Sequence, residues 1–139
     1  MNKRIDWIRY ALDLAKVAAT RSEDPHVKVG ATILREDYSV ASLGYNGVPP
    51  GIQINWSDRD ERRKRVIHAE INALRYIKPN EGYILACPIS PCRHCIQSIA
   101  SYGIKKVFYE EAYDKDEFAF ELAKEYKMHL GKYIEGIYD

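Results

Sequence analysis

Hydrophobic positions near the start of the chain repeat at helical spacing. Ile5, Ile8, Leu12 and Ala15 recur every three or four residues, which predicts a helix over residues 4–20. The stretch RSEDP follows, and its proline ends the helical pattern.

The next segments are rich in β-branched residues and predict a hairpin. Residues 27–34 (VKVGATIL) and 38–45 (YSVASLGY) are the expected strands, with RED as a tight turn between them. NGVPPG closes the hairpin with a turn or loop. Residues 52–67 are polar and charged, which indicates a loop with room for a short helical turn.

From residue 68 onwards, helical and strand patterns alternate. Strands that alternate with helices pair in parallel through right-handed crossovers, so we expect an α/β fold with one mixed five-stranded sheet. Helices would flank both faces as a three-layer structure, and residues 1–139 suit a single domain. The expected helices are 68–77, 91–103 and 115–126, and the expected strands are 83–89, 105–109 and 127–134.

Composition excludes several classes of protein. No run approaches the roughly 18 apolar residues of a membrane span, and the charged N-terminus does not read as a secretory signal. We therefore expect a cytoplasmic protein without a membrane partner. A net charge of +1 argues against a polynucleotide partner. The most basic segment, residues 59–65, is interpreted as a solvated face of mixed sign in preference to a phosphate site.

All three cysteines lie in CPISPCRHC, residues 87–95. Three thiols cannot all pair within one chain, and nothing indicates an oxidising compartment, so a disulfide is disfavoured. Cys92 and Cys95 fall three apart at the start of a predicted helix, whose positive end favours thiolates. Cys87 falls inside a predicted strand, where a free cysteine is expected to pack as a small apolar residue.

The sequence HAE, residues 68–70, begins the preceding predicted helix. Both helices should begin at the sheet edge where α/β proteins bind ligands, so His68, Cys92 and Cys95 can converge on one ion. One imidazole and two thiolates suit zinc, and three protein ligands leave a fourth position for water. Glu70 is placed to take a proton from that water. With Cys87 as a fourth ligand, the site would instead be a closed, structural zinc module.

H-x-E followed by P-C-x-x-C is the signature of zinc deaminases, and it stands here as HAE and PCRHC. RSEDPHVKVGATI, GYNGVPPG and HAEINAL also resemble segments of deoxycytidylate (dCMP) deaminases, in the same order, over residues 18–110. This resemblance implies the cytidine deaminase-like fold and one zinc ion per chain. It also implies hydrolysis of dCMP to dUMP and ammonia, which supplies thymidylate synthesis.

The resemblance implies roles for individual residues. Water activated by the metal would attack C4 of the cytosine, while Glu70 protonates N3 and then the departing ammonia. Many relatives are hexamers that dCTP activates and dTTP inhibits at a separate site. The implied substrate contacts are Asn46 to the sugar, the N–H of Ala69 to the base carbonyl, Tyr113 beside the base, and Ser90. Candidate contacts to an effector nucleotide are Ser22, Gly44, Asn46 and Gly47.

Some alternatives stay open. Arg21, Lys28 and Arg93 are candidates for binding the 5′-phosphate, and the sequence does not choose among them. A tRNA adenosine deaminase or another nucleobase deaminase would share HAE and PCxxC, but a tRNA enzyme needs a basic face. The extra cysteines that build a second, structural zinc site in some phage relatives are lacking, so a single zinc is expected.

Overall fold

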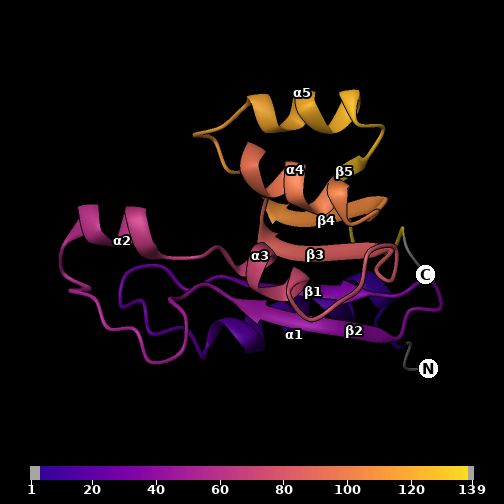
Figure 1. The fold of residues 1–139 in the computed structure, drawn as a ribbon. Coiled ribbons are helices and arrows are strands. Elements are labelled where there is room, and N and C mark those ends of the chain that lie inside the picture. The colour runs from indigo at the N-terminus through magenta and orange to yellow at the C-terminus, as the bar shows by residue number, and fades with distance from the viewer. Residues whose placement is uncertain (1–3, 138–139) are drawn as a thin grey trace.

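A computed structural model, which describes residues 4–137, shows one mixed five-stranded sheet with helices on both faces (Figure 1). Residues 1–3 and 138–139 of the expected domain lie outside this range. β1 pairs in antiparallel fashion with both β2 and β3, whereas β3, β4 and β5 run parallel. The predicted α/β class and mixed sheet are therefore confirmed. The strands are β1 Gly30–Leu34, β2 Val40–Tyr45, β3 Ile84–Ile89, β4 Lys106–Glu111 and β5 His129–Lys132, in the order β2-β1-β3-β4-β5.

Two core clusters join the helices to the sheet. Successive side chains of β3 point to opposite faces, so Ile84 and Ala86 pack with α1 while Leu85 and Cys87 pack with the other helices. Each large apolar side chain buried this way stabilises the fold by about 1.5–3 kcal/mol. The helices are α1 Trp7–Ala19 on one face, and α3 Ala69–Leu74, α4 Arg93–Ser101 and α5 Phe118–Glu125 on the other.

The loop expected over residues 52–67 contains a further helix, α2, at Arg59–Arg65. Asp58 caps it, because its carboxylate accepts hydrogen bonds from the backbone N–H groups of Asp60 and Glu61 at 2.9 and 3.2 Å. The pattern concealed this helix because none of its residues is buried and it carries no apolar stripe. Figure 1 shows α2 standing apart from the sheet, beyond the edge where α3 and α4 begin.

Some element boundaries also differ from the prediction. Tyr38 was expected in a strand, but it has a φ of +70° and lies in the turn, so β2 begins at Val40. The backbone N–H of Arg35 donates to the carbonyl of Ser39 at 2.8 Å and closes this turn. The helix expected over residues 68–77 ends at Leu74.

One edge of the sheet gathers the start of β1, the ends of β2, β3 and β4, and the first residues of α3 and α4. Helix starts present unpaired backbone N–H groups and a partial positive charge. This edge is therefore suited to bind anionic or polar groups. Among residues 4–137, no helix is both long enough and apolar enough to cross a membrane.

Candidate active site

Two helix starts bring three potential metal ligands together. His68 is the N-cap of α3, and Cys92 is the N-cap of α4, with extended backbone at both positions. Cys95 follows in the first turn of α4. The Nδ1 atom of His68 lies 3.3 Å from the Cys95 sulfur and 3.6 Å from the Cys92 sulfur. The ligand atoms of all three residues lie within 4.8 Å of one another, as the sequence predicts.

This geometry fits a zinc ion. Tetrahedral bonds of about 2.3 Å to sulfur and about 2.0 Å to nitrogen place the two atoms about 3.5 Å apart. The observed separations of 3.3 and 3.6 Å are close to that value. Because Nδ1 faces both sulfurs, His68 would bind the metal through Nδ1 and carry its proton on Nε2.

The two thiols of the group differ in acidity. A hydrogen bond from the Cys95 thiol, assisted by His68, lowers the pKa of Cys92 to about 3. The same pairing, together with burial, raises the pKa of Cys95 far above its ordinary value. The hydrogen bond with Cys92 raises the pKa of His68. The Cys92 sulfur therefore can bind a cation without first losing a proton, whereas metal binding would release the proton of Cys95.

Glu70 is a buried carboxyl beside this group and is 5% exposed. It belongs to the first turn of α3 and does not join the three-residue ligand group. Burial raises its pKa, whereas His68 acts in the opposite direction. A buried carboxyl of raised pKa exchanges protons at neutral pH more readily than an exposed one.

Cys87 lies within the apolar core, as the strand pattern predicts. It is fully buried and joins the cluster formed by β3, α3 and α4. Burial raises the pKa of its thiol well above the ordinary value. Among the described residues, the candidate metal group contains His68, Cys92 and Cys95 without Cys87.

A pocket of about 360 Å³ opens beside the group and is large enough for a small organic ligand. His68, Glu70 and Cys92 form part of its wall. Four residues that the family resemblance assigns to substrate also line it, namely Asn46, Ala69, Ser90 and Tyr113. The remaining wall comes from Asp24, Val27, Val29, Arg62, Arg63, Val66, Ile89 and Lys115.

Asn46 holds part of this wall in place. Its side-chain carbonyl accepts the N–H of Val29 at 2.8 Å, and its side-chain amide donates to the carbonyl of Val27 at 2.9 Å. It is only 6% exposed. The amide of Asn46 is thus already engaged with the backbone of residues that line the pocket.

Ser90 supports the opposite wall. Its hydroxyl accepts the backbone N–H of Tyr113 at 2.6 Å, and its own N–H donates to the carbonyl of Glu111 at 3.0 Å. Ser90 is 4% exposed, so its main contact lies within the protein. It fixes the segment that carries Tyr113 toward the pocket.

The other residues proposed for effector nucleotides lie in packed or backbone-paired positions. The hydroxyl of Ser22, a buried residue, donates to the carbonyl of Asn46 at 2.9 Å. Gly44 packs directly against the backbone of α3. Gly47 exchanges backbone hydrogen bonds with Ile67 at 2.9 and 3.1 Å. Of the four candidates, only Asn46 lines the pocket.

The basic residues on the pocket wall are not those expected from the sequence. Lys28 donates to the carbonyl of Ser22, and Arg93 pairs with Asp116 at 2.9 Å. Neither they nor Arg21 line the pocket, whereas Arg62, Arg63 and Lys115 do.

Helix α2 explains why the sequence missed two of these basic residues. Its Asp60–Lys64 pair, 3.1 Å apart, is solvated as expected, but Arg62 and Arg63 border the pocket. The backbone carbonyl of Trp56 accepts a hydrogen bond from Arg62 at 2.6 Å and connects α2 to the preceding loop. The usable signal was the run of basic residues shortly before HAE.

The fold and the His/Cys/Cys group with its neighbouring carboxyl define the class of zinc-dependent deaminases. Residues 5–111 match the family described as the cytidine and deoxycytidylate deaminase zinc-binding region. The chain therefore belongs to this family.

Two curated relatives and one solved structure show which members of the family the chain resembles. It is 32% identical over 126 residues to a probable deoxycytidylate deaminase of Caenorhabditis elegans, covering 85% of this chain and 63% of the relative. It is 36% identical over 129 residues to ComE operon protein 2 of Bacillus subtilis, covering 86% and 67%. The chain thus spans about two thirds of these relatives.

The solved structure is that of dCMP deaminase from the cyanophage S-TIM5 in complex with dCMP and dUMP. The match has a TM-score of 0.73 and 28% identity, and it covers 91% of this chain and 93% of the phage protein. The agreement therefore extends over nearly the whole fold.

Proposed function

We propose that the protein is a zinc-dependent hydrolase that converts dCMP to dUMP with release of ammonia. The observation that carries this proposal is the open three-ligand group of His68, Cys92 and Cys95 beside a buried Glu70 at the wall of a pocket. Support also comes from the relative named as a probable deoxycytidylate deaminase and from the phage enzyme that holds dCMP and dUMP.

In the proposed reaction, different residues bind the metal, transfer protons and bind the base. A zinc ion held by His68, Cys92 and Cys95 would supply the Lewis acidity that makes water nucleophilic near neutral pH. The Glu70 carboxylate accepts a proton at one oxygen, delivers it to N3 of the cytosine, and then carries a second proton to the departing amino group. The N–H of Ala69, at the first position of α3, is a helix-start donor for the base carbonyl.

The basic side chains of the pocket wall favour a nucleotide over a nucleoside. Arg62 and Arg63 approach the pocket from α2, and Lys115 approaches from the segment after β4. Three cations around one opening attract a 5′-phosphate, and guanidinium groups bind phosphate oxygens through paired hydrogen bonds. We assign the phosphate of dCMP to this group, in place of Arg21, Lys28 and Arg93.

The alternatives predict different results. A tRNA adenosine deaminase would act on tRNA and leave dCMP unchanged. A structural zinc module would bind zinc and deaminate neither. Purified protein loaded with zinc is therefore assayed for ammonia release from dCMP, deoxycytidine and tRNA. Turnover of dCMP in preference to the other two is expected, and its absence would contradict the proposal.

Arg63→Ala tests the phosphate assignment. Loss of one charge-assisted hydrogen bond costs about 1.5–3 kcal/mol, so kcat/KM for dCMP should fall about 10- to 100-fold while that for deoxycytidine changes little. Lys64→Ala is the matched control, because Lys64 lies on the same helix, pairs with Asp60, and does not line the pocket. Equal losses for both substrates, or a loss in the control, would refute the assignment.

Other expectations go with this function and remain predictions. They are a hexameric assembly, activation by dCTP, inhibition by dTTP, the supply of dUMP for thymidylate synthesis, and a cytoplasmic location. Sedimentation of the purified protein and dCMP assays with each triphosphate test the first three.

A further inference from the structure

The segment between β4 and α5, residues 112–117, carries Tyr113 and Lys115 into the pocket wall. A connecting segment of this kind keeps its side chains in place only where it is anchored to regular structure. One anchor is the hydrogen bond from the N–H of Tyr113 to the buried hydroxyl of Ser90, at 2.6 Å.

The second anchor is Asp116. Its carboxylate accepts the backbone N–H of Arg93 at 2.8 Å and Nε of the same residue at 3.0 Å, and Nη2 of Arg93 lies 2.9 Å away. Asp116 thereby binds the first residue of α4 through backbone and side chain together. The side chain of Asp116 is 11% exposed, whereas that of Arg93 is 47% exposed.

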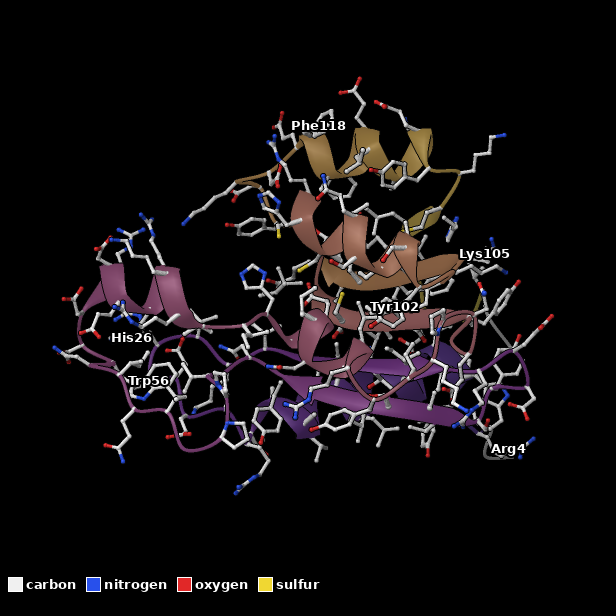
Figure 2. The ribbon with its side chains drawn as sticks, viewed as in Figure 1. Arg4, His26, Trp56, Tyr102, Lys105 and Phe118 are labelled. Carbon is white, nitrogen blue, oxygen red and sulfur yellow. The ribbon has the colours of Figure 1, made fainter. Side chains whose placement is uncertain are left out.

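Arg93 continues the connection to α5. Its guanidinium lies over the ring of Phe118, 5.0 Å from the ring centroid. Phe118, which is labelled in Figure 2, is the first residue of α5. Arg93 directly follows Cys92, the N-cap, and is the first residue of α4. The turn that supplies two sulfurs is thus joined directly to the segment that supplies Tyr113 and Lys115.

We infer that Asp116 is a positioning residue, which fixes Tyr113 and Lys115 over the pocket relative to the first turn of α4. Asp116 does not line the pocket, so it acts through these neighbours. The inference rests on the proposed function in one respect, namely that Lys115 faces the phosphate of the substrate.

Asp116→Ala tests the inference on the full-length, zinc-loaded protein. Because Lys115 and Tyr113 lose their fixed position, we expect KM for dCMP to rise about tenfold, with a smaller change in kcat. The ratio of kcat/KM for dCMP to that for deoxycytidine should fall, since deoxycytidine has no phosphate for Lys115. Asp116→Asn retains an acceptor for the N–H of Arg93 and should recover part of the loss.

Asp114→Ala is the matched control, since Asp114 is an exposed acidic residue of the same segment. Zinc content and melting temperature identify variants that fail to fold. A purely structural role would lower the active fraction, and thus kcat, equally for both substrates, and this result would overturn the inference. So would an unchanged KM in Asp116→Ala, or an equal rise of KM in Asp114→Ala.

Binding of dUMP separates this inference from the proposed function. If the wild-type protein binds dUMP but does not turn over dCMP, the proposed function fails. The inference is then tested by the dissociation constant for dUMP, which should rise about tenfold in Asp116→Ala. If the wild-type protein neither binds dUMP nor deaminates dCMP, both are wrong.

Discussion

Replacement of Gly44 by alanine would force β2 away from α3. A Cβ atom at Gly44 would lie 2.4 Å from the backbone nitrogen of Ala73 and 2.6 Å from the backbone oxygen of Ala69. Both are backbone atoms, so no flexible side chain can move aside. Restoring an ordinary contact of 3.4 Å requires a displacement of α3 by about 1 Å.

The same helix carries the candidate proton carrier. Glu70 lies in the first turn of α3 and His68 caps it, so a displacement of α3 moves both relative to α4. A misplacement of about 1 Å at a reacting group lowers turnover by about 100-fold. Overpacking of this kind also lowers the free energy of unfolding by about 1–3 kcal/mol.

The assay compares Gly44→Ala with Gly47→Ala by urea unfolding, zinc content and turnover of dCMP. A Cβ at Gly47 meets no heavy atom within 4 Å, so its free energy of unfolding should stay within about 1 kcal/mol of the wild type. Wild-type stability and turnover in Gly44→Ala would refute the packing argument. Wild-type stability with an altered response to dCTP would instead favour an effector contact at Gly44.

Three further changes test other parts of the structure. Cys87→Ala should keep one zinc per chain by metal analysis, because Cys87 packs in the core outside the ligand group. Loss of zinc from this variant would indicate a closed, four-ligand site. Tyr133→Phe removes the 2.6 Å hydrogen bond to Asp6, the N-cap of α1. The free energy of unfolding in urea should fall by about 1 kcal/mol. An unchanged free energy of unfolding would show that this hydrogen bond does not stabilise the fold. Hydrogen bonds from the Lys78 backbone N–H and from Arg35 hold the pKa of Glu81 below 4.5, so its contribution to stability is present above pH 4.5 and is lost as the pH falls through its folded-state pKa. Glu81→Gln should therefore flatten the acid side of the curve of melting temperature against pH, and an unaltered curve would contradict this.

The fold was predictable because its buried faces leave a period in the sequence. Ile8, Leu12 and Ala15 are almost completely buried, as their helical spacing predicts. The first four residues of β3 form a continuous apolar run and are buried on both faces of the sheet. The ligand group was predictable for a different reason. His68, Cys92 and Cys95 stand at two helix starts, and their residue types and spacing form the H-x-E and P-C-x-x-C pattern, which is visible in the sequence without knowledge of the fold.

The remainder depended on contacts that no local pattern encodes. Arg62 and Arg63 lie on a helix without an apolar stripe, so its position beside the pocket could not be read from periodicity. Arg93 is adjacent to Cys92 in sequence, yet its side chain binds Asp116, 23 residues away, and does not line the pocket. The basic composition of residues 59–65 was visible, but the face they present to the pocket was not.

Proton transfer by Glu70 beside a zinc ion held by three side chains is tested most directly by the turnover of dCMP in the wild-type protein and in Glu70→Gln, each of measured zinc content. Glutamine keeps the size of the buried side chain but cannot shuttle a proton. One zinc per chain is expected in both proteins, with turnover of dCMP in the wild type alone. Comparable turnover in Glu70→Gln, or no turnover by the zinc-loaded wild type, would contradict this mechanism.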